Sequence, residues 1–287
     1  MVNVIIGIIA YIVLAPFVGG FLAGVDRIVS ARLQGRYGPP LLQPFYDVLK
    51  LREKEDITVN NVQDFYVAAF FIFVIATGAI FFAGGDLLLV IFTLTTASVL
   101  LIMAAYSSNS PYAQVGAQRE LLQMMAYEPM VLLTCVGFYM VNGSFEVRNI
   151  VTDANMDFLP LIGVFFGFLF ILTIKLRKRP FDLSMSHHAH QELVKGLVTE
   201  FSGKTYALIE VAHWYETILL LGMIFLFFAG CPIIGIIVVI VGYFLEILID
   251  NIFPRVTWQM TVKSLWLATL ILGVLNIVLL GFFGGIF

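Results

Sequence analysis

The sequence predicts an all-α membrane protein with about eight transmembrane helices and an amphipathic surface helix after the first of them. Of its 287 residues, 60% are hydrophobic and only 12% are charged, and the mean hydropathy is +0.97. Soluble domains carry about 25% charged residues, so a water-soluble fold of this length could not bury so much apolar surface. The apolar residues also come in long runs, as membrane-spanning helices require.

Eight apolar runs are long enough, at close to 20 residues each, to cross the hydrocarbon core of a bilayer. The first is too long for the hydrophobic region of a signal peptide and no basic segment precedes it, so we expect a retained helix. Pro232 separates the sixth run from the seventh, because proline ends one helix and is accepted in the first turn of the next. The runs cover about residues 2–25, 65–84, 86–106, 121–141, 158–175, 212–230, 232–249 and 263–283.

The basic residues support this count of helices and orient them. Of the 16 Lys and Arg residues, 15 lie on or beside the first, third, fifth and seventh connections, and Arg148 alone lies on the other side. Connections rich in Lys and Arg stay in the cytoplasm, so the odd-numbered loops are predicted to be cytoplasmic and both termini to lie outside.

Two of the cytoplasmic loops, at about residues 26–64 and 176–211, are longer than simple connections. Long ordered loops usually carry function. The stretch from Asp26 to Lys54 alternates apolar and charged residues, which predicts an amphipathic segment on the membrane surface, broken at Gly38-Pro39-Pro40 and at Pro44. We expect residues 1–287 to form a single transmembrane domain.

Ionisable side chains in the predicted helices are candidates for function, because a spanning helix carries them only at a cost of a few kcal/mol. Glu210, His213 and Glu216 are spaced i, i+3, i+6 and so share one broad helix face. Such groups can form a chain that exchanges protons, or they can be solvated or paired at helix ends. The second interpretation is favoured for Glu246 and Asp250, which lie close to a predicted membrane interface. The full set is Glu120, Glu128, Glu210, His213, Glu216, Glu246 and Asp250.

The sequence shows no motif of a self-contained enzyme. His187, His188 and His190 resemble a metal site, but no fourth ligand is evident, and solvated loop histidines are favoured. Cys135 and Cys231 lie in apolar runs and form neither a metal cluster nor a disulfide framework. No phosphate-binding loop or nucleophile elbow is present, so no cofactor or metal is expected on this chain.

The loops carry four motifs that resemble a known family. They are Ala31-Arg-Leu-Gln-Gly-Arg-Tyr-Gly-Pro with Leu42-Gln-Pro-Phe-Tyr-Asp; Gly116-Ala-Gln-Arg-Glu with Tyr127-Glu128; Arg179-Pro-Phe-Asp-Leu with Gln191-Glu-Leu-Val, Glu200-Phe-Ser-Gly and Tyr206-Ala-Leu; and Pro254-Arg255. In this order, the motifs resemble the complex I heel subunit, the membrane subunit at the junction with the peripheral arm. It has counterparts in membrane-bound [NiFe] hydrogenase, formate hydrogenlyase and sulfane reductase complexes.

The resemblance implies a non-catalytic coupling subunit with eight helices and both termini outside. It implies partners too: [NiFe]-hydrogenase-like large and small subunits, antiporter-like membrane subunits, and ferredoxin as the electron donor. Iron–sulfur clusters, and a [NiFe] centre in the hydrogenases, would lie on those partners. No nucleic-acid partner is expected. The two long loops would dock the peripheral arm, and acidic residues would lead protons away from it.

Combined with the intramembrane charges, the resemblance gives two sets of candidate site residues. The proton-relay set is Glu120, Glu128, Glu192, Glu200, Glu210, His213 and Glu216. The docking set is Arg32, Arg36, Arg119, Arg179 and Asp182.

Departures from the family pattern favour one branch of the family. Between Leu183 and Glu192 the chain has Ser-Met-Ser-His-His-Ala-His-Gln, where quinone-reducing members have a shorter acidic stretch, and His213 replaces their usual Glu. These changes favour a quinone-free, ferredoxin-dependent complex that evolves hydrogen or reduces a sulfur compound. The alternative is the quinone-binding subunit of a complex I-like NADH or ferredoxin dehydrogenase. An independent transporter is disfavoured, because paired broken helices in matching halves are not evident.

Overall fold

The computed structural model describes residues 2–55, 60–152, 158–181, 184 and 193–283. Over these ranges almost every element is helical, and the only strand-like features are two isolated bridges, Asp86 to Glu146 and Phe181 to Val256. Seven helices in the described part are long and apolar enough to cross a membrane, and the shorter apolar helix Leu159–Lys175 makes an eighth. The predicted fold class is confirmed, and each of the eight apolar runs corresponds to one helix.

The spanning helices are α1, α3, α4, α5, α7, α8, α9 and the α10–α11 rod, and two short helices, α2 and α6, lie between them. Their bounds are α1 Val2–Leu33, α2 Gln43–Glu53, α3 Asn61–Phe82, α4 Leu87–Tyr106, α5 Pro111–Asn142, α6 Val147–Thr152, α7 Ile162–Lys175 after the 3-10 turn Leu159–Leu161, α8 Gly203–Leu226, α9 Pro232–Ile252, α10 Trp258–Ala268 and α11 Leu275–Phe283. The π-helical turn Thr269–Val274 joins α10 to α11 without a break.

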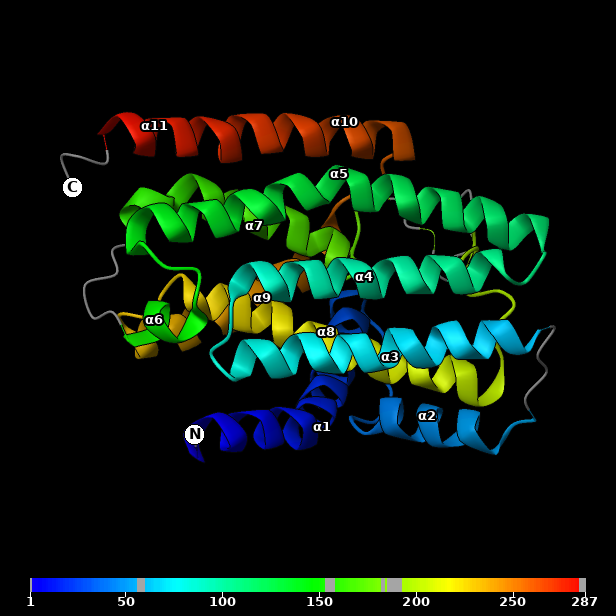
Figure 1. Cartoon of the computed structure of the whole chain (residues 1–287). Coiled ribbons are helices and arrows are strands. Elements are labelled where there is room, and N and C mark those ends of the chain that lie inside the picture. The colour runs from blue at the N-terminus through cyan, green and yellow to red at the C-terminus, as the bar shows by residue number, and fades with distance from the viewer. Residues whose placement is uncertain (1, 56–59, 153–157, 182–183, 185–192, 284–287) are drawn as a thin grey trace.

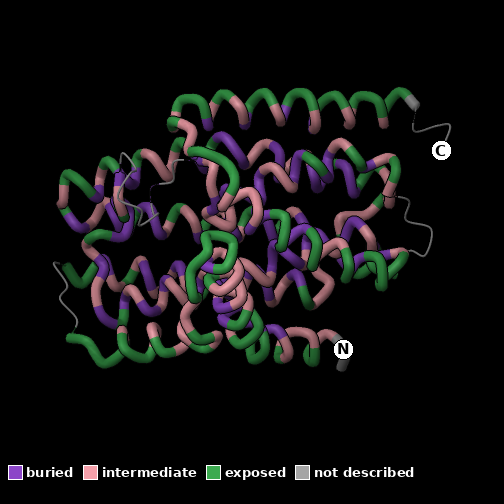
Figure 2. The backbone as a smooth tube through the Cα atoms, turned by 180° about the vertical axis from the view of Figure 1, so that it is seen from behind, coloured by how far each residue is buried: buried purple, intermediate pink, exposed green. Residues whose placement is uncertain are grey.

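The spanning helices run roughly side by side, as Figure 1 shows, and α2 lies at the opposite end of the bundle from the two termini. The described ends of the chain, in α1 and α11, lie at the same end as α6. An even number of crossings brings both termini to one side, so this arrangement agrees with eight helices. In Figure 2 the α10–α11 rod is exposed along much of its length, as a helix facing lipid would be.

Local sequence signals set several helix ends. Asn60 and Asp86 cap α3 and α4 by accepting hydrogen bonds from backbone N–H groups two residues on, at 3.2 and 2.8 Å. Gly143 ends α5 with a φ of 70°, a left-handed conformation that glycine adopts without a steric penalty.

Two predicted features of the loops differ from the structure. Asp26 to Leu33 is not a surface segment but the last two turns of α1, and Pro44 does not break the surface helix but lies in the first turn of α2. The surface helix therefore begins only at Gln43. A polar side chain can continue a helix beyond the hydrocarbon core, so hydropathy alone places the boundary too early.

A proline inside α1 is compensated by α8. Pro16 has no N–H, so the carbonyl of Ile12, four residues earlier, loses its helical donor. The Tyr215 hydroxyl donates to this carbonyl at 2.7 Å, and the Tyr11 hydroxyl donates in turn to the Tyr215 carbonyl at 3.1 Å. A broken backbone bond in lipid needs such a replacement, so this pair fixes α1 against α8 beside the polar interior.

Candidate functional site

Lys175, the last residue of α7, lies in the buried polar region of the bundle. Its Nζ is 3.3 Å from Glu216 Oε1 on α8 and 4.6 Å from the ring centre of Tyr127 on α5. The side chains of Lys175 and Glu216 are only 7% and 11% exposed. An unpaired charge at this depth would cost several kcal/mol, so the carboxylate and the aromatic face are needed to hold the ammonium. Three helices therefore meet at one charged contact.

Glu210, His213 and Glu216 share one face of α8, as their spacing predicts, and all three line a polar cavity of about 320 Å³. His213 Nδ1 lies 3.5 Å from Glu216 Oε2, and its ring stands edge-on to Phe70. The rest of the lining comes from α1, α9, the connection after α9 and the segment after α7, with Asp26, Arg27, Arg177, Lys178, Arg179, Asp250 and Arg255 among the lining residues. We call this space the polar cavity.

Two smaller cavities continue inward from Lys175. The middle cavity, about 30 Å³, is lined by Glu120, Tyr127, Lys175, Arg177 and Glu216, with Phe70, Ser98 and Leu101. The inner cavity, about 10 Å³, is lined by Thr95, Tyr127, Glu128 and Lys175, with Ile91, Leu94 and Val131. Since a water needs about 10–15 Å³, the middle cavity has room for about two waters and the inner one for at most one. Lys175 lines all three cavities, which makes it the junction between them.

Glu128 lies near the middle of α5 and is partly buried. The Thr95 hydroxyl on α4 lies 2.6 Å from Glu128 Oε1 and 3.0 Å from the carbonyl oxygen of Ile91, so its single proton is shared between these two acceptors. Pro129 follows directly, which removes the helical donor of the Met125 carbonyl and marks a weak point in α5. The carboxyl group is thus fixed on one side by Thr95 and faces the inner cavity on the other.

Glu120 lines the middle cavity, closer to the loops than Glu128, and lies in the first three turns of α5. The hydroxyl of Ser184, from the segment between α7 and α8, donates to its Oε2. The same segment packs tightly on α5: a Cβ at Gly116 would lie only 2.4 Å from the carbonyl carbon of Gly196. Tyr112 extends the contact, since its hydroxyl accepts from Val194 N–H at 2.7 Å and donates to the Val194 carbonyl at 2.9 Å. A movement of this loop would therefore reach Glu120 directly.

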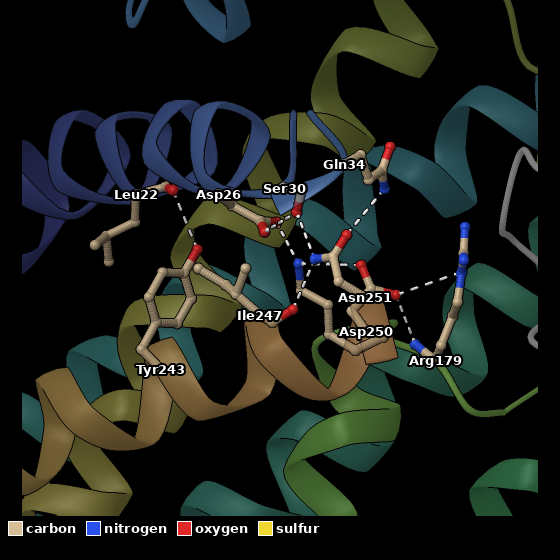
Figure 3. Close-up of polar contacts among 10 residues, drawn as sticks. Leu22, Asp26, Ser30, Gln34, Arg179, Tyr243, Ile247, Asp250 and Asn251 are labelled. Carbon is tan, nitrogen blue, oxygen red and sulfur yellow. Dashed lines mark hydrogen bonds and ion pairs between the residues drawn. The ribbon is translucent and has the colours of Figure 1, made fainter. Parts of the chain in front are cut away.

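The predicted docking arginines lie at or near the loop end of the bundle, outside the two inner cavities. Arg32 in the last turn of α1 and Arg36 just after it are both exposed, and the Arg32 guanidinium lies 5.4 Å from the ring centre of Tyr37. Arg119 lies over the Trp258 ring at 5.0 Å. Arg179 is bound to Asp250 of α9, with Nε 3.7 Å and the backbone N–H 2.9 Å from Asp250 Oδ1, as Figure 3 shows.

Glu200 is a predicted relay residue that does not line this site. Glu200 is half-buried and its backbone carbonyl accepts from Gln63 at 3.4 Å, but it lines none of the three cavities. Asp182 and Glu192 lie outside the described residues, as do His187, His188 and His190. Within the described ranges, no group of three or more His, Cys, Asp or Glu residues is placed to hold a metal ion.

Sequence reasoning did not single out Lys175 or Tyr127 as site residues. A signal existed for Lys175, because a lysine in the last turn of a short, otherwise apolar helix must find a partner or reach water. Tyr127 carried no such signal, since an aromatic residue in an apolar run is most often part of the core. Only the packing of α5 against α7 places its ring under the ammonium.

Comparisons with known proteins agree with this architecture. The family model described as NADH dehydrogenase matches residues 5–281. One subunit of the F(420)H(2) dehydrogenase of Methanosarcina mazei is 30% identical over 249 residues, covering 75% of this chain and 70% of that protein. One subunit of the NADH-quinone oxidoreductase of Dehalococcoides mccartyi is 29% identical over 286 residues, covering 90% and 80% of the two chains.

A solved structure is similar over nearly the whole chain. It comes from the membrane-bound sulfane sulfur reductase, an archaeal respiratory membrane complex, with a TM-score of 0.81 and 27% identity, covering 96% of this chain and 99% of that one. The resemblance seen in the loop motifs is therefore confirmed. With its family match, its relatives and the eight apolar helices of its described residues, this chain belongs to the NADH dehydrogenase family of multi-pass membrane subunits.

Proposed function

We propose that this chain is the membrane coupling subunit of a ferredoxin-dependent, ion-translocating respiratory complex of the membrane-bound hydrogenase or sulfane reductase type. It anchors a peripheral redox arm and relays protons through buried carboxyl groups. The observation that carries this proposal is the Lys175 junction, which links the polar cavity beside the loops to Glu128 in the membrane.

The geometry supplies a route with two parts. Glu210, His213 and Glu216 line the polar cavity, and Glu120 and Glu128 lie beyond Lys175. A proton reaching Glu216 removes the negative charge that pairs with Lys175, so the ammonium then favours a carboxylate elsewhere on its cavities. Lys175 thereby couples the protonation of one side of the junction to that of the other.

The loops give the relay a link to the redox arm. Ser184 binds Glu120 and Arg179 binds Asp250, so the first part of the segment after α7 contacts carboxyl groups of the bundle at two points. Electron transfer in the arm changes the charge that these loops face, and the relay responds to it. In this proposal the loops are cytoplasmic, both termini lie outside, and the iron–sulfur clusters and any [NiFe] centre belong to partner subunits.

A second candidate is the quinone-binding subunit of a complex I-like dehydrogenase. One feature favours it: an apolar cleft of about 470 Å³ between α1, α8 and α9 adjoins the polar cavity, and Tyr243 lines both. An isoprenoid chain fits such a cleft with its polar head in the cavity. Against it stand the loop departures between Leu183 and Glu192 and at His213.

One experiment separates the two candidates. The intact complex, purified through a tag on this chain, is supplied with reduced ferredoxin and assayed for hydrogen, for sulfide from polysulfide, and for reduction of a short-chain quinone. Hydrogen or sulfide supports the first candidate and identifies the acceptor. Quinone reduction without either product supports the second and overturns the first.

A further inference from the structure

A cluster of charged residues joins α1, α9 and the segment after α7 at the loop end of the bundle. Lys178 binds Asp26 of α1 and lies 3.9 Å from Asp250 of α9. Asp250 also holds Arg179, as Figure 3 shows. Next to it, Asn251 donates to Ser30 at 3.1 Å and accepts from Gln34 at 2.9 Å. The cluster fixes the start of the α7–α8 segment to two helices.

Within this cluster the contacts balance two cations against two carboxylates. Lys178 and Arg179 are the cations, and Asp26 and Asp250 are their partners. The Lys178 side chain is 9% exposed, and those of Asp26 and Asp250 are 23% and 21% exposed, so these groups are largely shielded from bulk water although they line the polar cavity. An additional carboxylate nearby would leave the cluster with a negative charge that none of these contacts neutralises.

Glu246 is that additional carboxyl group. It lies one turn before Asp250 on α9 and is only 1% exposed. Its Oε1 is 3.5 Å from the Thr173 hydroxyl of α7, and its Oε2 has no hydrogen-bond partner among the described residues. No ion pair joins Glu246 to Lys178 or Arg179 within the described part of the chain.

An ionised carboxylate with one long hydrogen bond and no cation in contact is strongly disfavoured in a dry site, whereas a neutral acid is tolerated. The charged groups that act on it are Lys178 after α7 and Asp250 on α9, which in turn hold Asp26 and Arg179. Glu210, His213 and Glu216 of α8 line the polar cavity together with Asp250 and with Arg27, Arg177 and Arg255, and Glu246 is not among the residues that line that cavity. The balance favours a proton on Glu246.

We propose that Glu246 is a proton-binding site on α9, separate from the Glu120 and Glu128 branch, and that Lys178 controls it. While Lys178 stays on Asp26 and Asp250, Glu246 keeps its proton. If the segment after α7 moves Lys178 one helical turn deeper, the ammonium pairs with the Glu246 carboxylate, and the proton leaves toward the polar cavity, which Asp250 lines one turn away. The site depends on burial and charge balance alone, so it stands whether or not the relay of the proposed function exists.

The test is infrared difference spectroscopy on the intact purified complex at neutral pH, comparing wild type with E246Q. The expected result is the loss of one carboxylic acid C=O band, a band that moves to lower frequency in D2O. E146Q is the matched control, because it makes the same substitution at an exposed glutamate at the other end of the bundle, away from this cluster. E146Q should leave the acid band in place.

T173V is a second variant with which the proposal can be tested if the E246Q complex does not accumulate. T173V removes the one hydroxyl that contacts the Glu246 carboxyl group, so it should shift the frequency of the acid band without removing it. The proposal is overturned if E246Q removes a carboxylate band instead of an acid band, or if neither E246Q nor T173V changes the acid region.

Discussion

Lys175 and Glu216 form an ion pair at the meeting point of α7 and α8, with Nζ and Oε1 3.3 Å apart and both side chains almost wholly buried. Each charge is the main compensation for the other. The losses of stability caused by removing each charge alone should therefore not add up in a variant that lacks both. This relationship leads to the first test.

K175M keeps the length of the side chain and removes its charge, which leaves Glu216 without its ion-pair partner in a buried site. We expect a loss of about 3–5 kcal/mol in stability, since breaking one side of a buried pair leaves an uncompensated ion. The double variant K175M/E216Q removes both charges and should recover most of that loss. Thermal unfolding of the purified complex measures both values, and an equally unstable double variant would show that the pair does not carry this energy.

Glu128 is the innermost carboxyl group on the proposed route. E128Q keeps its shape and its contact with Thr95 but removes the proton acceptor, so ion uptake per turnover should fall about tenfold or more. The redox reaction of the peripheral arm should survive in detergent. E146Q, at the other end of the bundle, is the control and should leave uptake unchanged. Equal loss of assembly, redox activity and uptake in E128Q would instead indicate a structural role.

The number and order of the spanning helices follow from the sequence, because an apolar run of membrane length is seldom anything other than a spanning helix. The residues at which the helices begin and end cannot be predicted in this way. α5 begins at Pro111 and α8 at Gly203, about ten residues before the predicted starts, since polar residues can continue a helix into water. Hydropathy indicates which residues lie in the hydrocarbon core, and it carries no information about where a helix ends outside that core.

The part of the candidate site that depends on spacing along a single helix could be predicted from the sequence. Glu210, His213 and Glu216 share the polar cavity as their i, i+3, i+6 spacing predicts. Contacts between helices could not be read in this way. Lys175 meets Tyr127, and Lys178 meets Asp26, only because α7 packs between α5 and the α1–α9 pair, and no local pattern encodes those neighbours.

Arg179 is predicted to hold the segment after α7 in the position that docks the peripheral arm. R179A removes the guanidinium contact with Asp250, although the backbone N–H contact stays, so retention of the arm in detergent should fall severalfold. R148A, at the opposite end of the bundle, should not change it. Co-purification of the arm through a tag on this chain gives the measurement. Full retention and unchanged activity in R179A would show that this arginine has no docking role.

Asp47 of α2 binds Arg27 of α1 at 2.6 Å and accepts from Gln43 at 2.9 Å. Burial alone would raise the pKa of Asp47, but the hydrogen bonds from Arg27 and Gln43 and the charges of Arg27 and Lys50 lower it below its usual value of 3.8. A lowered pKa in the folded state means that the contact stabilises α2 at neutral pH and is lost as the pH falls below that value.

The effect should be small, because both side chains are 40–45% exposed and such pairs contribute at most about 1 kcal/mol. D47N should therefore increase hydrogen–deuterium exchange of residues 43–53 at neutral pH, up to about fivefold, with other helices unchanged. The wild type should show the same increase only in acid, after correction for intrinsic exchange rates. An unaltered α2 in D47N would show that packing alone holds this helix.

The most direct test of coupling through the Lys175 junction uses the intact complex in sealed liposomes, supplied with reduced ferredoxin, with product formation and ion uptake recorded together. Wild type should accumulate ions in step with turnover, and K263M, which changes an exposed lysine, should match it. K175M should keep turnover once the membrane is made leaky but lose ion uptake. Uptake that stays in step with turnover in K175M would contradict the account.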